Sequence, residues 1–502
     1  MINLFRPFLG GVAILYPTRM YKSPTARTFP FLSTIQQRSL HSLRVPVLRP
    51  KARHWTSVAL SILTMASSSH ALASVGQPPS RRYDYTPPAW AKDKLEHLPT
   101  AGRLHMANLP TPLYQWSRST SGSSSASASS PSILQRLEEL EITLYIKRDD
   151  MTGGCETGGN KIRKLEFLLA DALEKGYRKV VTIGGEQSNH CRATASACRM
   201  VGLEPHLILR TPRANEIQQA TKETEGGIGY TGNILFDRMV GSSIYTCTPG
   251  EYGRVGSQQL VQRLCAHLEE TSGDKVYPIP VGGSNGLGTW GYIQGVDELL
   301  SQWTSIETKP SLHHLVFACG SGGTAAGISV GTALAFEALA GLSPPTVHAI
   351  GVCDDPDYFY NHVAGIAQEM GLKLPDGITR EEYIRKSMVV HQGKGLGYAA
   401  STPEELDFIA ALAVETGVVL DPVYSGKALY QFFTSELQNP ENVQKYRGKN
   451  ILFWHTGGAL GLYEKAESLL SVIGGKAPVK RLDLYGKGGG TNTIDISQPS
   501  EP

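Results

Sequence analysis

The chain has 502 residues and a formal net charge of +3, from 48 basic and 45 acidic side chains. This length exceeds one ordinary hydrophobic core and predicts two folded domains with extensions. The balanced charge contains no basic stripe, so we expect no nucleic-acid partner. The seven cysteines form no pairs with zinc-ligand spacing, so we expect reduced thiols and no metal site.

The first part of the chain differs in composition from the rest. Residues 1–83 contain no Asp or Glu, and their basic residues are scattered among Ser, Thr and aliphatic residues. This composition is typical of an organelle transit peptide, so we assign residues 1–82 to a transit peptide and disordered leader. We expect a mitochondrial location, with a chloroplast as the alternative. The apolar segment 58–65 is too short to span a bilayer, and we expect no membrane association.

Two later segments have low complexity. Residues 117–132 are rich in Ser and Ala and predict a flexible surface insertion. Residues 475–502 are rich in Gly and Lys and predict a disordered tail.

Between these segments, β-branched runs alternate with helical patterns of apolar residues. Such alternation predicts an α/β fold in which βα units build parallel sheets. We expect a large domain from residues 83–163 and 276–474, interrupted by a small domain from residues 164–275.

Lys161 follows Gly158, Gly159 and Asn160 and opens a predicted helix over residues 162–173. A helix start supplies backbone N–H groups and a positive dipole end, which favour an anion. Burial there would lower the pKa of the lysine toward a nucleophilic free amine. Lys161 is therefore a candidate Schiff-base lysine, and the alternative is a solvated lysine at a helix start.

A second polar helix start follows the predicted strand 179–183. Ser188, Asn189 and His190 come after the strand and a glycine turn, where α/β proteins place ligand groups. These residues are either part of a site or an N-cap cluster, because Ser and Asn are favoured N-caps.

A third feature is the hydrophobic run 314–319, which leads into Gly320-Ser321-Gly322-Gly323-Thr324 and a helix of small residues. Backbone N–H groups, a hydroxyl and a helix start then converge on one point, which suits a phosphate. The alternative is tight packing of helix on strand, which also uses glycine.

Two of these motifs resemble one known family. Gly-Gly-Asn-Lys-x-Arg-Lys-Leu-Glu, followed by Gly-Gly-x-Gln-Ser-Asn-His, is similar to the pyridoxal-phosphate enzymes that include 1-aminocyclopropane-1-carboxylate (ACC) deaminase and D-cysteine desulfhydrase. The resemblance covers residues 109–462 and implies fold type II: two domains with open, mostly parallel sheets and helices on both faces. It also implies pyridoxal 5'-phosphate as cofactor, an amino acid as substrate and a homodimer.

The resemblance implies roles for matching residues. The cofactor would be held by Lys161, Lys164, Asn189, Gly320, Ser321, Gly322, Gly323, Thr324 and Ser425. The substrate would be held by Ser188, Asn189, His190, Tyr398 and Tyr424. The expected catalytic residues are Lys161, Ser188, Tyr398 and Tyr424.

Two positions distinguish this chain from ACC deaminase within the family. Ser425 falls where ACC deaminase has a carboxylate against the pyridine nitrogen, and His190 falls where it has Gln. A hydroxyl holds the ring proton less firmly, which makes the cofactor a weaker electron sink and suits loss of a good β-leaving group. We therefore expect β-elimination of D-cysteine to pyruvate, ammonia and hydrogen sulfide. The alternative is ACC deamination to 2-oxobutyrate and ammonia.

Two other classes remain open. A dinucleotide oxidoreductase could use the Gly320 loop with Asp354 or Asp355, although this reading leaves the Lys161 motif unexplained. A protein that binds the cofactor without turnover is the other alternative, which Ser188 and the tyrosines argue against.

Overall fold

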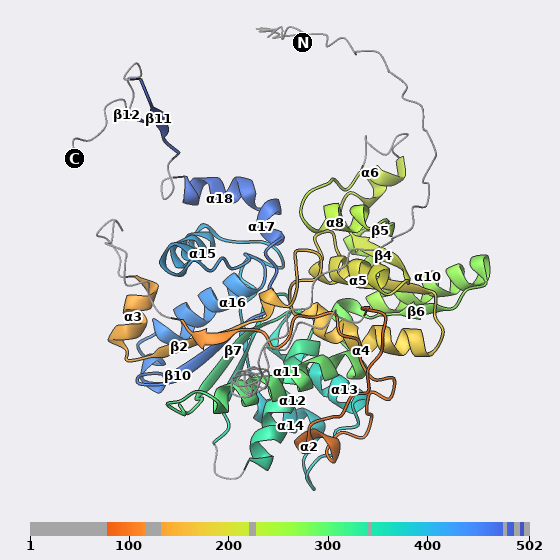
Figure 1. The fold of residues 1–502 in the computed structure, drawn as a ribbon, viewed down its shortest axis with the longest axis horizontal. Helices are drawn as coiled ribbons and strands as arrows, with labels where there is room; N and C mark the ends of the chain where they lie inside the picture. The colour runs from red at the N-terminus through yellow and green to blue at the C-terminus, as the bar shows by residue number, and fades with distance from the viewer. Residues whose placement is uncertain are drawn as a thin grey trace, which may run out of the picture. The chain divides into compact units, whose positions relative to one another are not determined.

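The computed structural model describes residues 78–116, 132–219, 227–339, 343–474, 479–485 and 492–495. Most of the expected transit peptide and leader (residues 1–82) and nearly all of the Ser/Ala-rich insertion lie outside these ranges. Two separate sheets occupy the middle of the chain (Figure 1).

The larger sheet has six strands in the order β1-β2-β10-β7-β8-β9. Its first strand is antiparallel to its neighbour, and all other neighbours are parallel. The strands are β1 (Leu113–Gln115), β2 (Thr143–Arg148), β7 (His314–Cys319), β8 (Thr346–Gly351), β9 (Val389–Gln392) and β10 (Asn450–His455).

The smaller sheet has four parallel strands in the order β5-β4-β3-β6. They are β3 (Lys179–Gly185), β4 (Glu204–Arg210), β5 (Ser243–Cys247) and β6 (Val276–Pro278). Strand β6 lies in the segment that we expected in the large domain, yet it pairs with β3 of the small sheet. The proposed domain boundary at residue 275 thus falls directly before a strand of the smaller sheet.

Helices cover both faces of the larger sheet. One side carries α11 (Gly286–Thr304), α12 (Gly323–Ala338) and α13 (Pro356–Glu369), and the other carries α15 (Pro403–Thr416) and α16 (Ser425–Phe432). Along β7, Leu315 and Phe317 pack into the first of these cores, whereas Val316 and Ala318 pack into the second. This two-sided burial explains why β7 is an uninterrupted apolar run.

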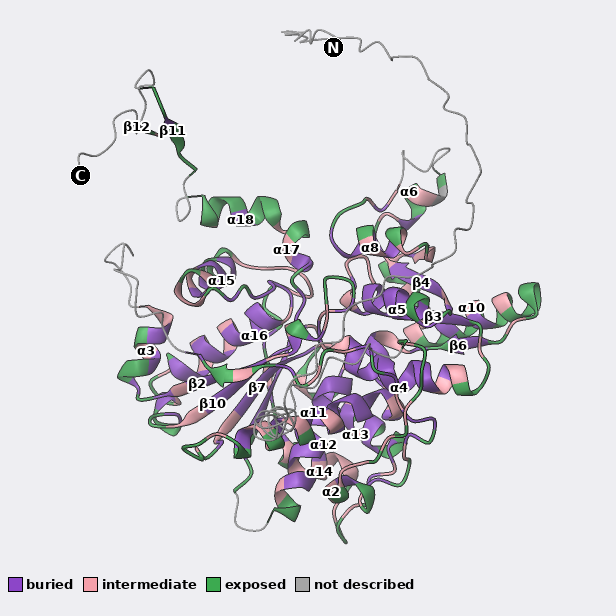
Figure 2. Cartoon of the chain, in the orientation of Figure 1, coloured by how far each residue is buried: buried purple, intermediate pink, exposed green. Residues whose placement is uncertain are grey.

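The smaller sheet is also covered on both faces. Its cores include residues of α4 (Lys161–Glu174), α5 (Asn189–Met200) and α8 (Asn233–Met239) on one side and α10 (Ser257–Ser272) on the other. Figure 2 shows buried residues along the strands, α4 and α5, whereas α18 (Ala466–Ile473) is largely exposed. The predicted α/β fold with mostly parallel sheets is confirmed.

Shorter elements complete the described chain. They are α2 (Ala89–Lys92), α3 (Ile133–Glu139), η1 (Asp149–Met151), α6 (Ala214–Gln219), α9 (Pro249–Val255), η2 (Val281–Gly283), α14 (Arg380–Ser387), η3 (Phe433–Leu437), η4 (Val443–Lys445), α17 (Gly461–Glu464), β11 (Arg481–Asp483) and β12 (Thr493–Asp495). Strands β11 and β12 pair in parallel, within the tail for which we expected disorder.

The described residues lack two kinds of functional feature. Among them, no helix combines the length and apolarity needed to cross a bilayer. Within the same ranges, no cluster of three or more His, Cys, Asp or Glu side chains could hold a metal ion. All seven cysteines are free.

Candidate active site

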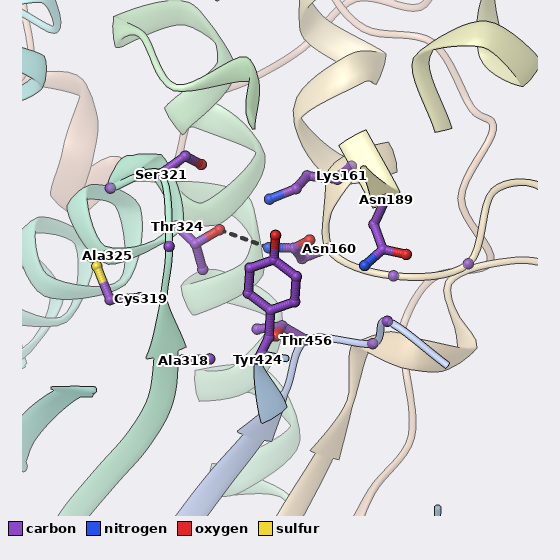
Figure 3. Close-up of a pocket in the computed structure, with 16 residues that line it drawn as sticks. Asn160, Lys161, Asn189, Ala318, Cys319, Ser321, Thr324, Ala325, Tyr424 and Thr456 are labelled. Atoms are coloured by element: carbon purple, nitrogen blue, oxygen red, sulfur yellow. Dashed lines mark hydrogen bonds between the residues drawn. The ribbon is translucent and has the colours of Figure 1, made fainter. Parts of the chain in front are cut away.

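A pocket of about 500 Å³, partly open to solvent, lies where the strands β7 and β10 end and where α4, α5 and α12 begin. Because parallel strands end at the same edge of a sheet, residues far apart in sequence meet there. The lining residues are Gly158, Gly159, Asn160, Lys161, Asn189, Ala318, Cys319, Gly320, Ser321, Gly322, Thr324, Ala325, Tyr424, Thr456, Gly457 and Gly458. In Figure 3 the side chains of Lys161, Thr324 and Tyr424 converge on this space.

Lys161 is the first residue of α4, and its backbone position is fixed by two neighbouring loops. The Asn160 N–H donates to the Thr456 carbonyl at 2.9 Å, and the Asn160 side-chain amide donates to the Thr324 hydroxyl at 3.0 Å. Gly159 has φ +107°, a conformation that L side chains rarely adopt. The glycine and the two hydrogen bonds therefore turn the chain so that the lysine enters the pocket.

The Lys161 amine is poised to be a nucleophile. Burial lowers its pKa to about 8, and the positive charge of Arg192 acts in the same direction. A lowered pKa increases the fraction of free amine near neutral pH. This is the property that the sequence predicted for Lys161.

The glycine loop after β7 forms the opposite wall. A Cβ at Gly320 would approach the Tyr424 ring to 3.0 Å, and one at Gly322 would lie 2.5 Å from the His362 ring. Gly322 also has φ +81°. The loop therefore requires glycine both for its space and for its backbone conformation.

Lys164 lies behind this loop, and its amine is buried. A Cβ at Gly323 would be 2.8 Å from its amine nitrogen. In the described structure the amine donates to the Gly282 carbonyl at 3.1 Å, and the Ser284 hydroxyl lies at 3.5 Å. Both partners are neutral, and burial together with Lys161 holds the pKa of Lys164 well below its ordinary value. An anion at the loop would favour the protonated form of this amine, so the donor set fits a phosphate group.

Two tyrosines from separate loops meet at the pocket. Tyr424 lines it, and its hydroxyl lies 2.7 Å from that of Tyr398. The guanidinium of Arg210 lies over the Tyr398 ring at 5.7 Å. Burial raises the pKa of both phenols, and that of Tyr424 well above the ordinary value, so both are neutral near pH 7.

The three polar residues at the start of α5 differ in their placement. Asn189 lines the pocket. Ser188 is the N-cap of α5, and its hydroxyl accepts the Cys191 N–H at 3.1 Å. His190 is 4 % exposed, and its Nε2 lies 2.8 Å from the Thr182 hydroxyl of β3. Neither Ser188 nor His190 lines the pocket, so the structure brings only Asn189 directly to it.

Ser425 begins α16 and is fully buried. Its N–H donates to Asp421 at 2.8 Å, and its hydroxyl oxygen lies 3.3 Å from the hydroxyl of Thr456, which lines the pocket. Thr456 and Asn160 were not among the site residues predicted from the sequence. The Gly457-Gly458 turn after β10 and the position of Asn160 before Lys161 were the signals that could have identified them.

One of the two carboxylates considered for a dinucleotide site caps a helix. Asp355 is the N-cap of α13 and accepts the Tyr358 N–H at 2.9 Å. This contact explains Asp355 as a local helix cap.

Comparisons with known proteins agree with the geometry of the pocket. The family described as "Pyridoxal-phosphate dependent enzyme" matches residues 129–457. The chain is 43% identical over 390 residues to a "Bifunctional D-cysteine desulfhydrase/1-aminocyclopropane-1-carboxylate deaminase, mitochondrial" of Arabidopsis thaliana, covering 78% of this chain and 86% of the relative. It is 31% identical over 379 residues to the D-cysteine desulfhydrase of Salmonella typhi, covering 74% of this chain and 98% of the relative.

A solved structure of an ACC deaminase homologue has a similar fold. Its TM-score is 0.55 at 29% identity, and the match covers 74% of this chain and 96% of the other. The resemblance that the lysine and serine motifs predicted is thereby confirmed, together with the cofactor. The protein belongs to the family of pyridoxal-phosphate dependent enzymes.

Proposed function

We propose that the protein is a D-cysteine desulfhydrase that converts D-cysteine and water to pyruvate, ammonia and hydrogen sulfide. The observation that carries this proposal is the Lys161 amine, with its pKa lowered to about 8, opposite a glycine loop that fits a phosphate. The hydroxyl of Ser425 favours D-cysteine over ACC, because it binds the ring proton less firmly than a carboxylate would. Two of the relatives described above carry desulfhydrase in their names.

In this proposal, different residues of the site would bind different groups of the cofactor. Lys161 would bind the cofactor covalently, and Lys164 with the loop Gly320-Ser321-Gly322-Gly323-Thr324 would hold its phosphate. Asn189 would donate to its phenolic oxygen, and Ser425 would face its ring nitrogen. When bound, the cofactor withdraws electrons from the Cα atom of the substrate and so acidifies the proton there.

The side chains then move protons and hold the substrate. The Lys161 amine, freed when the substrate amine replaces it, would take the Cα proton, and Ser188 is the second candidate for this step. The electron pair of the Cβ–S bond leaves with the sulfur as sulfide, and water completes the conversion to pyruvate and ammonia. Tyr398 and Tyr424 hold the carboxylate or the thiol. His190 lies behind the pocket, where its bond to Thr182 positions the start of α5.

ACC deaminase is the second candidate function. It is favoured by the relative from Arabidopsis thaliana, whose name carries both activities. In this case the same pocket would convert ACC to 2-oxobutyrate and ammonia.

The proposal extends to location and assembly. The acid-free composition of residues 1–83 and the mitochondrial name of the Arabidopsis relative support a mitochondrial transit peptide. We further propose a homodimer, and a division into a large domain (83–163 and 276–474) and a small one (164–275).

The first experiment measures products from D-cysteine, L-cysteine and ACC with the purified protein. We expect pyruvate and sulfide from D-cysteine, and none from a Lys161→Ala variant. Lys175→Ala is the matched control, because this lysine is exposed beyond the far end of the same helix. Production of 2-oxobutyrate from ACC without turnover of D-cysteine would replace the first function by the second.

A further inference from the structure

Ser425 is connected to a chain of polar side chains that leads away from the pocket. Its hydroxyl oxygen lies 3.0 Å from Nδ1 of His455, the last residue of β10. The Thr456 hydroxyl and the Gly457 carbonyl lie farther from this oxygen, at 3.3 Å and 3.4 Å, and the Asp421 carboxylate also interacts with the serine hydroxyl. The histidine is therefore nearer to the serine hydroxyl than Thr456 and Gly457 are.

The chain continues to a carboxylate. His455 Nε2 lies 3.7 Å from Asp150 Oδ2. Asp150 in turn receives two hydrogen bonds from Arg148, at 2.8 Å and 2.7 Å. His455 and Arg148 are directly paired across the strands β10 and β2. The parallel register of these strands thus brings Ser425, His455 and Asp150 into one row.

The hydrogen bonds around His455 indicate which nitrogen carries its proton. The Gly457 N–H donates to Nδ1 at 3.3 Å, so this nitrogen must offer a lone pair. The ring proton is then on Nε2, facing Asp150. Burial lowers the pKa of His455 to about 4, with Asp150, Arg148 and Asp149 as the charged groups around it, so the ring is neutral near pH 7.

A neutral ring with its lone pair on Nδ1 offers a nearer acceptor to the serine hydroxyl than the Gly457 carbonyl at 3.4 Å. When the Ser425 O–H donates toward Nδ1, the lone pairs of its oxygen are free to accept from another group. We propose that His455, supported by Asp150, is a positioning residue that makes Ser425 a hydrogen-bond acceptor and so helps retain a proton on the ring nitrogen of the cofactor. The inference rests on the proposed function, because that function places Ser425 against this nitrogen.

Ser425 and His455 together would give the protonated ring nitrogen part of the stabilisation that a carboxylate would give it directly. Ser425 alone could also donate to an unprotonated ring nitrogen, which would favour loss of the ring proton. With His455 as its acceptor, the hydroxyl instead favours the protonated ring, although less strongly than a charged neighbour does. With this row of side chains, the cofactor would withdraw electrons more strongly than with Ser425 alone and less strongly than with a carboxylate.

The test uses the full chain loaded with pyridoxal 5'-phosphate that carries ¹⁵N in its ring, without substrate. The ¹⁵N chemical shift reports the protonation of the ring nitrogen directly. In His455→Ala we expect the apparent pKa of this nitrogen to fall by about one unit, a tenfold change in its protonation equilibrium. Asp150→Asn should lower it in the same direction by a smaller amount.

Tyr114→Phe is the matched control. Its hydroxyl accepts from Arg148 at 2.6 Å, outside the row, so this variant should keep the wild-type shift. Unchanged shifts in both His455→Ala and Asp150→Asn would overturn the inference. If His455→Ala does not fold or take up the cofactor, Asp150→Asn decides alone, because Asp150 is partly exposed. Since no substrate is present, a failure here is distinct from a failure of the proposed function, which appears as absent pyruvate in the wild type.

Discussion

The hydroxyl groups of Tyr398 and Tyr424 lie 2.7 Å apart, although the two residues come from separate loops. Both phenols are neutral near pH 7, because burial raises their pKa values. One hydroxyl must therefore donate to the other, which leaves a single O–H free for another partner. The two tyrosines form one polar unit at the wall of the pocket.

This pairing predicts non-additive effects of mutation. Tyr398→Phe and Tyr424→Phe should each lower kcat/KM for D-cysteine by ~10²-fold, the lower range for loss of a proton-handling group. The kcat/KM of the double variant should be only slightly lower than that of the less active single variant, because the two hydroxyls act together. Steady-state kinetics on the four proteins measures this, with the exposed Tyr463→Phe as control. Effects that multiply in the double variant would contradict a shared role.

The glycine loop predicts a specific loss of cofactor binding. In Gly322→Ala the new Cβ would lie 2.5 Å from the His362 ring, in a backbone conformation that costs an L residue about 1–2 kcal/mol. The loop must shift, so we expect weaker binding of pyridoxal 5'-phosphate in an absorbance titration of the apoprotein. Gly365→Ala is the control, because nothing lies within 4 Å of its Cβ position. Equal affinities in the two variants would show that the loop does not hold the cofactor.

The lowered pKa of Lys161 predicts how the apoprotein takes up its cofactor. Only the free amine reacts with the aldehyde, and its fraction increases as the pH rises through about 8. The rate of cofactor uptake, followed by stopped-flow absorbance, should therefore rise with a midpoint near pH 8 and reach a plateau about one to two pH units higher. An ordinary lysine would have its midpoint about two units higher, near pH 10.4. A midpoint in that range would mean that Lys161 is solvated in the apoprotein.

Buried histidines predict a loss of stability in mild acid. Burial holds the pKa values of His190 and His348 well below the ordinary value, and lowers those of His314 and His455 to about 4. In the unfolded chain these rings bind protons below about pH 6.5, whereas the folded protein keeps them neutral. The unfolded state then binds more protons, so the free energy of unfolding falls as the pH decreases from about 7 to 5.

Three of the described carboxyls act in the opposite direction, and one of them is Glu166, whose pKa is raised by burial. Burial raises the pKa of Asp237 to about 7 and that of Asp421 to about 6, so their protonation stabilises the folded state in acid. Because more histidines than carboxyls have shifted pKa values, we expect a net decrease in the free energy of unfolding as the pH falls from about 7 to 5. Urea unfolding at pH 7.5, 6 and 5 measures it, and His348→Asn should reduce the dependence on pH. A flat profile for the wild type would contradict the prediction.

Local sequence was sufficient for the main elements of the site. A continuous apolar run followed by Gly-Ser-Gly-Gly-Thr predicted the strand β7, the glycine loop and the start of α12. The position of Lys161 at a helix start was equally local. Strand and helix periods, glycine turns and N-caps depend on neighbours within a few residues, so they can be read from one sequence.

Tertiary structure alone decided which way the side chains face. Ser188, Asn189 and His190 are adjacent in sequence, yet only Asn189 lines the pocket, because α5 packs on β3 and turns His190 toward Thr182. The contacts of Ser425 with His455 and of Tyr398 with Tyr424 join segments that are 30 and 26 residues apart. Such contacts depend on strand register and on the packing of loops at one sheet edge. A periodic pattern in the sequence carries no information on either.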